Sequence, residues 1–341
     1  MISAPKESIE TCQKDLQGTS SPKLHIIGNQ FFLTEFLLES VRNEPNIAIH
    51  FHPRKKRGAH RSLLKLWEAY SYWPMKGSLF FPEDYVSQLG QIGEEDSVLI
   101  FGIENIKELR IIKKLISSRK ISIFTWNPVV DYNQNKWFRS IHIESLKKIG
   151  VVFTFDPLNA RDYNLQLIDQ VYRDVSEFQT VNLQSNTIRD VYFVGQDKGR
   201  LSQLRYWEEL LRSMAIRVLF VVVGDRNKRY SLQEKEFLSP QGLSYQDNIR
   251  NILGSDCLFE IVQSNQSGLT VRSMEAFFFG KKLITNNKWI CQAPLYSPDH
   301  VFIIGKDNIA DLHDFLAKPI SRLSSAELRR YEFKSWCQQF R

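Results

Sequence analysis

Residues 190–224 read DVYFVGQDKGRLSQLRYWEELLRSMAIRVLFVVVG. A short apolar run at 190–194 ends at a glycine, apolar residues three and four apart follow at 201–214, and a second apolar run fills 218–223. Apolar runs of strand length that alternate with amphipathic helices are typical of a parallel sheet covered on both faces. This stretch therefore predicts one β–α–β unit of an open α/β domain.

The same alternation extends toward both ends of the chain. Further strand-like runs occupy 24–27, 47–51, 97–101, 121–125, 151–155, 257–262, 282–285 and 301–304. The periodicity weakens near 165–188, so the sequence predicts two successive doubly wound α/β units joined there. The expected organisation is a polar tail, an N-terminal domain, a linker, a C-terminal domain and a terminal helix that packs back on the N-terminal domain, at 1–22, 23–170, 171–188, 189–318 and 319–341.

Length, charge and composition narrow the class of protein. The chain has 341 residues with 43% hydrophobic and 24% charged residues, which is ordinary globular composition. No apolar run approaches the roughly 20 residues that span a bilayer, and the polar N-terminus has no signal-peptide core, so we expect a soluble, cytoplasmic protein. The four cysteines lie far apart, which argues against a zinc site or a disulfide framework. The net charge of +7 suits an anionic partner.

Ligands of open parallel sheets bind beyond the carboxyl ends of the strands, so the loops at those ends are candidate sites. The first such loop contains Gly195, Asp197, Lys198 and Arg200 and leads directly into a helix. Glycines let a ligand approach the backbone, and the free N–H groups of a helix start attract phosphate, as do the cationic side chains. The loop predicts a phosphate site. The alternative is a tight turn whose charges are solvated.

The second candidate loop, residues 263–276, also follows a strand and begins a helix. The polar or small residues at its helix start are Gln266, Ser267, Gly268 and Thr270. Arg272 and Glu275 are three residues apart, so they share one face of the helix. N–H groups at the helix start suit a diphosphate, and a carboxylate in the next turn suits sugar hydroxyls. The alternative is an ordinary N-cap with a surface Arg–Glu pair.

These residues carry a family resemblance. Residues 275–285, EAFFFGKKLIT, resemble the donor-binding signature of the GT-B glycosyltransferases, and the loop at 195–200 lies where those enzymes have a phosphate loop. Bacterial proteins of lipopolysaccharide or capsule biosynthesis are similar over most of 95–340, at the motifs TWNP, TFD, VGQDKGR, QSGLT and ITNN, residues 125–128, 154–156, 194–200, 266–270 and 284–287. One departure is Ser267, because many retaining GT-B enzymes have an acidic residue eight positions before the glutamate. The resemblance therefore implies no stereochemistry.

The resemblance implies two Rossmann-like domains that face each other across a cleft. It implies a glycosyltransferase that moves a sugar from a nucleotide-sugar to a lipopolysaccharide, O-antigen or capsule acceptor, without a cofactor or a bound metal. Lys198, Arg200 and Arg272 would then bind the diphosphate, and Glu275 would hold sugar hydroxyls. Tyr245 would stack on the base, or simply pack, and Asn286 and Asn287 would reach the same ligand, or shape a turn.

A general base is expected at a strand end of the N-terminal domain. Asp156, Glu104 and Asp131 are the candidates, although each position is also typical of a helix cap or turn. The basic run from Arg54 to Arg61, with four nearby Trp and Tyr residues, is expected to contact an anionic or lipid-linked acceptor or the inner-membrane surface, which would make the protein peripheral. A nuclear signal or a solvated loop are the alternatives.

Two rival functions are compatible with the sequence. A sugar-nucleotide epimerase of the GT-B type would use the same nucleotide site without an acceptor. A nucleic-acid-binding protein would explain the net positive charge, but the charges are mixed along the chain and no nucleic-acid-binding motif is present. We therefore expect no nucleic-acid partner.

Overall fold

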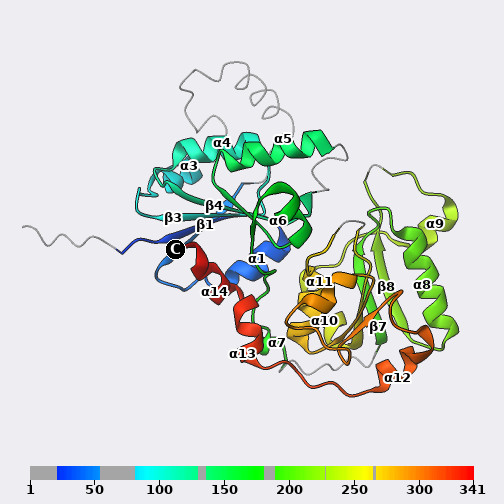
Figure 1. Ribbon diagram of the computed structural model, residues 1–341. Coiled ribbons are helices and arrows are strands. Elements are labelled where there is room, and N and C mark those ends of the chain that lie inside the picture. Colours follow the sequence, from blue (N-terminus) through cyan, green and yellow to red (C-terminus); the bar gives the residue numbers. More distant parts are fainter. Residues whose placement is uncertain (1–20, 54–80, 130–135, 180–188, 227, 264–265) are drawn as a thin grey trace, which may run out of the picture.

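The computed structural model describes residues 21–53, 81–129, 136–179, 189–226, 228–263 and 266–341. Two lobes lie side by side, and each is built on a parallel sheet of six strands with helices on both faces (Figure 1). The predicted pair of doubly wound α/β units is thereby confirmed. The basic run at Arg54–Arg61 and Asp131 lie outside the described residues.

The first sheet has the strand order β2-β1-β3-β4-β5-β6. Its strands are β1 Leu24–Asn29, β2 Ile47–His52, β3 Ser97–Phe101, β4 Lys120–Thr125, β5 Val151–Thr154 and β6 Gln166–Leu167. The helices between them are α1 Phe32–Glu39, α3 Glu83–Gly90, α4 Ile106–Leu115, α5 Lys136–Lys147 and α6 Pro157–Tyr163. Helices α3, α4 and α5 cover one face of this sheet, and α1 lies on the other, toward the second lobe (Figure 1).

The second sheet has the order β12-β11-β10-β7-β8-β9. Its strands are β7 Arg189–Gln196, β8 Val218–Val223, β9 Leu238–Ser239, β10 Ser255–Glu260, β11 Lys282–Thr285 and β12 Val301–Ile303. Its helices are α8 Leu201–Ser213, α9 Leu232–Phe237, α10 Tyr245–Leu253, α11 Val271–Phe279, the 3-10 turns η3 Lys288–Gln292 and η4 Ile309–Asp311, and α12 Leu312–Ala317. Helices α10 and α11 lie on the side of this lobe that faces the first (Figure 1).

The terminal segment differs from the single helix that the sequence predicts. Ser324 and Glu327 form a capping box at its start, but the segment is divided into α13 Ser325–Leu328, η5 Arg329–Tyr331, α14 Phe333–Trp336 and η6 Cys337–Phe340. The helix ends because Glu332 adopts an extended conformation and the backbone on either side of it bonds to Tyr172, beyond β6 and before α7 Ser176–Gln179. The end of the chain then packs aromatic rings against the first sheet, with Trp336 4.9 Å from Phe124.

One buried cluster of apolar side chains runs through both lobes. It includes Leu24 and Phe101 of the first sheet, Leu283 of the second and Trp336 of the terminal segment. Where α1 meets α10, the rings of Phe36 and Tyr245 lie 4.6 Å apart. The two lobes therefore share a core.

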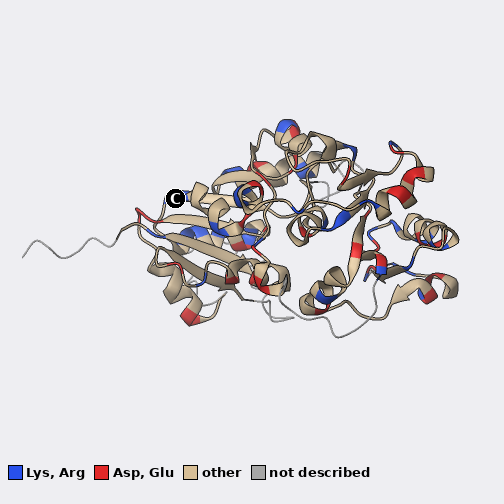
Figure 2. Ribbon diagram, turned by 90° about the horizontal axis from the view of Figure 1, so that it is seen from below, with Lys and Arg blue, Asp and Glu red and all other residues tan. Residues whose placement is uncertain are grey.

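Described basic and acidic residues are interspersed along both lobes (Figure 2). Among the described residues, no helix is both long enough and apolar enough to span a bilayer.

The buried histidines of the first sheet lead to a prediction for stability. His25 Nδ1 lies 2.9 Å from His50 Nε2, and burial lowers the pKa of both below the ordinary value of 6.5. Below that pH the unfolded chain binds more protons than the folded one, so the free energy of unfolding should fall as the pH falls from 7.5 to 5.5. Urea denaturation at the two pH values measures the loss. His50→Gln should lose less stability between the two pH values than the wild type, whereas His313→Gln, at an exposed position, should lose as much. An equal loss in all three proteins would contradict the assignment.

Candidate functional site

A cavity of about 330 Å³ lies between the two lobes. It is found where the sequence places the ligand, beyond the carboxyl ends of β4 and β5 on one side and of β7 and β10 on the other. The first lobe contributes mostly aromatic and apolar side chains: Phe31, Phe32, Trp126, Asn127 and Phe155. The second lobe contributes charged and polar side chains, which include Lys198, Arg200, Tyr245, Glu260, Arg272 and Glu275. The wall thus combines a flat apolar surface with concentrated charge.

The structure brings the three predicted cationic side chains, Lys198, Arg200 and Arg272, to this one cavity. The Arg200 guanidinium donates to the carbonyl oxygens of Gln196, at 2.7 Å, and Ile261, which fixes it between the ends of β7 and β10. Lys198 has a φ of 44°, in the left-handed region, and its N–H donates to Asp225. The predicted phosphate loop is thus a tight turn, as in the alternative interpretation, but this turn lines the cavity.

Arg272 and Glu275 form a buried ion pair on the first turns of α11, not a surface pair. Arg272 Nη1 lies 2.5 Å from Glu275 Oε2, and the two side chains are 13% and 2% exposed. Arg272 also donates to the Val194 carbonyl at 3.1 Å. Burial by itself lowers the pKa of Arg272, but the Glu275 carboxylate and three nearby tyrosine hydroxyls together outweigh burial and raise that pKa. Arg272 is therefore a fixed cation at the cavity wall.

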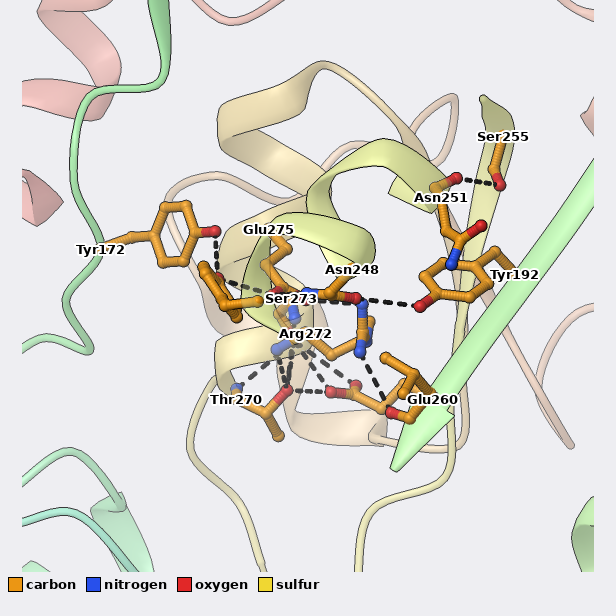
Figure 3. A network of polar contacts seen from close by, with 12 residues as sticks. Tyr172, Tyr192, Asn248, Asn251, Ser255, Glu260, Thr270, Arg272, Ser273 and Glu275 are labelled. Carbon is orange, nitrogen blue, oxygen red and sulfur yellow. Dashed lines mark hydrogen bonds and ion pairs between the residues drawn. The ribbon is translucent and has the colours of Figure 1, made fainter. Parts of the chain in front are cut away.

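The other Glu275 oxygen is held by a network of hydroxyl and amide groups (Figure 3). Glu275 Oε1 accepts from the Tyr245 hydroxyl at 2.8 Å and from Asn248 Nδ2 at 2.9 Å. The Tyr245 hydroxyl lies 2.5 Å from that of Tyr172, in the segment between the lobes, and Tyr192 donates to Asn248 Oδ1. Burial and the nearby Glu275 raise the pKa of Tyr245, so it stays a neutral phenol. Both Tyr245 and Glu275 line the cavity, with their polar atoms already engaged in this network.

Glu260 is a cavity residue that the sequence interpretation missed. Its carboxyl accepts hydrogen bonds from the hydroxyls of Thr270, Thr285 (2.6 Å) and Ser273 (3.3 Å), and burial raises its pKa. The group joins the start of α11, at Thr270 (Figure 3), to the end of β11, at Thr285. One signal was available in the sequence, because Glu260 is the single charged residue in the apolar run at 257–262.

Several other predicted residues take part in the site in different ways. Gly195, Gln266 and Thr270 line the cavity, and Thr270 caps α11 through the N–H groups of Arg272 and Ser273. Asp197 is fully buried and instead organises its loop, accepting from Lys228 at 2.6 Å and Tyr230 at 2.8 Å.

Asn286 and Asn287 serve the backbone around the cavity, which corresponds to the turn alternative. Asn286 accepts from the Val262 N–H at 2.6 Å, and Asn287 caps η3 and donates to the Gly268 carbonyl at 3.1 Å. Neither is among the described residues that line the cavity.

The described candidates for a general base are not on the cavity wall. Asp156 is fully buried and caps α6 through the Asn159 N–H, while its oxygens also accept from Ser267 and Gly268 of the other lobe. Glu104 accepts from the N–H of Asn127 at 3.3 Å; Asn127 lines the cavity, and Glu104 lies behind it. The cap alternative thus describes Asp156, and Ser267 and Gly268 contact Asp156 rather than the cavity.

Comparisons with known proteins identify the fold. No protein-family model matches the chain, and no curated protein matches it by sequence. Among solved structures, OtsA in its apo form is similar at 10% identity with a TM-score of 0.52, over 93% of this chain and 98% of that one. The catalytic domain of starch synthase IV of Arabidopsis thaliana, bound to ADP and acarbose, is similar at 8% identity with a TM-score of 0.51, over 94% and 98%. A glycosyltransferase from Rickettsia africae is similar at 10% identity with a TM-score of 0.50, over 94% and 97%. The chain has the GT-B fold of these glycosyltransferases.

Proposed function

We propose that the protein is a glycosyltransferase that moves a sugar from a nucleotide-sugar to a cell-surface glycan of the lipopolysaccharide, O-antigen or capsule type. The observation that carries the proposal is the convergence of Lys198, Arg200 and Arg272 with the start of α11 at one cavity between two α/β lobes. A departing nucleoside diphosphate accumulates negative charge, and fixed cations and the positive end of a helix dipole stabilise such charge. In this proposal the cationic side chains, and not a metal ion, neutralise the leaving group.

The first lobe offers a surface for the acceptor. Trp126 and Asn127 follow β4, and Phe31 and Phe32 follow β1, so aromatic faces lie opposite the charged wall. Aromatic faces with a neighbouring amide suit a sugar ring, which has apolar C–H faces and polar edges. We assign the acceptor to this side. Contact with the inner-membrane surface remains a prediction from the basic run near residue 54.

Calorimetry against UDP, GDP, CMP and ADP tests the site. We expect one of them to bind, and Lys198→Ala to weaken that binding by about 10- to 150-fold, because a charge-assisted hydrogen bond to phosphate is worth about 1.5–3 kcal/mol. Lys235→Ala, which changes an exposed lysine of α9, is the matched control and should bind like the wild type. Failure of the wild type to bind any of the four, or equal binding by Lys198→Ala, would contradict the proposal.

The epimerase alternative shares the nucleotide site and is separated by its products. Incubation with the nucleotide-sugar alone would release the free nucleotide and a hexosamine from an epimerase, whereas a transferase should need a glycan acceptor. A nucleic-acid-binding protein would show micromolar binding that weakens steeply with salt. We expect turnover only when the acceptor is present.

A further inference from the structure

A carboxylate of the first lobe is buried against the second. Asp156 follows β5, and its side chain is fully buried. Its Oδ2 accepts from the N–H groups of Ser267 at 2.7 Å and Gly268 at 3.0 Å, and its Oδ1 accepts from the Ser267 hydroxyl at 2.7 Å. The Ser267 hydroxyl in turn accepts from the Leu158 N–H at 3.1 Å. Each lobe therefore both donates and accepts hydrogen bonds in this contact.

The contact requires an unusually close approach of the two backbones at Gly268. A Cβ atom at this position would lie 2.6 Å from the Phe155 carbonyl oxygen and 3.0 Å from the Asp156 Cα atom. Real Cβ atoms do not approach backbone atoms so closely, so glycine is needed here for space. The glycine that the sequence interpretation assigned to phosphate binding is explained by lobe contact.

The segment held in this way, residues 266–270, also forms part of the cavity wall. Gln266 and Thr270 line the cavity on either side of the contact. The next backbone groups of the segment are held too, with the Leu269 carbonyl accepting from Gln170 at 3.2 Å and the Gly268 carbonyl accepting from Asn287 at 3.1 Å. Of these partners Asn287 alone belongs to the second lobe. The shape of this wall therefore depends on groups outside its own lobe.

We propose that Asp156 is a positioning residue that fixes segment 266–270 in the conformation that binds the nucleotide. The assignment of the ligand depends on the proposed function, but the effect on the segment does not. In this arrangement the second lobe binds its ligand well only while the first lobe is docked against it. The affinity for the ligand therefore depends, through Asp156, on the contact between the lobes.

The chemistry at Asp156 requires a carboxylate and not an amide. Three of its four hydrogen-bond donors are backbone N–H groups, from Asn159, Ser267 and Gly268, and they divide between the two oxygens. Asn at this position would turn an NH₂ group toward at least one of these N–H groups in either orientation. In one orientation the N–H groups of Ser267 and Gly268 lose their acceptor, and in the other the Ser267 hydroxyl loses its acceptor. A buried donor without an acceptor is costly, so the segment should loosen in either case.

Amide hydrogen exchange of the free protein tests the segment directly. We expect Asp156→Asn to speed exchange within residues 266–274 at least tenfold. Ser267→Ala keeps the bond from the Asn159 N–H to Asp156 but removes the acceptor of the Leu158 N–H, and it should speed exchange in the same place by a smaller factor. Asn105→Ala is the matched control, because it removes the side-chain cap of another helix of the first lobe, α4. It should leave exchange in 266–274 unchanged. If this segment exchanged at the wild-type rate in both Asp156→Asn and Ser267→Ala, the proposal would be overturned.

Nucleotide affinity provides the second measurement. With whichever of UDP, GDP, CMP or ADP binds the wild type, Asp156→Asn should weaken binding about tenfold, and Asn105→Ala should not weaken it. Faster exchange with unchanged affinity would overturn the positioning role while leaving the proposed function intact. If none of the four nucleotides binds the wild type, the proposed function fails, and exchange alone decides whether Asp156 holds the segment.

Discussion

Replacing Glu275 by Gln should lower the free energy of unfolding by about 3–5 kcal/mol, the usual result of removing one partner of a buried ion pair. Gln has the size of Glu, and its carbonyl oxygen can still accept from Tyr245 and Asn248. The substitution therefore removes the charge that faces Arg272 and turns the amide NH₂ group toward the guanidinium, which stays protonated and is 13% exposed. Urea denaturation of the two proteins at pH 7.5 measures the difference.

Glu208→Gln is the matched control for this prediction. Glu208 also pairs with an arginine of its own helix, at 2.8 Å from Arg212, but the arginine is 58% exposed. Such pairs contribute about 0.5 kcal/mol, so the control should unfold almost like the wild type. If Glu275→Gln lost no more stability than Glu208→Gln, water in the cavity would be solvating Arg272. The ion pair would then not stabilise the packing of α11.

The longer strands of both lobes could be predicted because each sheet is covered by helices on both faces, which favours continuous apolar runs. A run such as VLFVVV at 218–223 has no polar side to obscure its limits, and the structure places β8 at Val218–Val223. The two-residue strands β6 and β9 were missed because each is too short for any periodicity. The break in the terminal segment was missed for another reason: the extended Glu332 depends on pairing with Tyr172, which is remote in the sequence.

The candidate site shows the same division between local and remote causes. Lys198, Arg200 and Arg272 could be placed together because strand ends of a parallel sheet meet at one edge. The contact of Asp156 with Ser267 joins two lobes across 111 positions of sequence, and no local pattern announces it. Asp156 was correctly located at a strand end, but its neighbours decide its role, and they come from the other lobe.

Replacing Trp336 by Ala should lower the free energy of unfolding by about 3–5 kcal/mol. The side chain is fully buried, with its ring 4.9 Å from Phe124 and 4.8 Å from Phe340, and its indole N–H donates to the Asp169 carbonyl at 2.9 Å. Asp169 lies in the segment that leaves the first lobe after β6. Trp336 therefore connects the end of the chain, the first sheet and the segment between the lobes, and chemical denaturation should show the loss.

Two further variants separate the ring from the hydrogen bond. Trp336→Phe keeps an aromatic ring against Phe124 but leaves the Asp169 carbonyl without its donor, so it should cost about 1–3 kcal/mol, less than Ala. Trp289→Ala changes a tryptophan of η3 that is 40% exposed, and it should cost less than Trp336→Ala because less buried surface is lost. A Trp336→Ala protein as stable as Trp289→Ala would mean that the terminal segment can leave the first lobe without loss. The shared core would then not depend on the end of the chain.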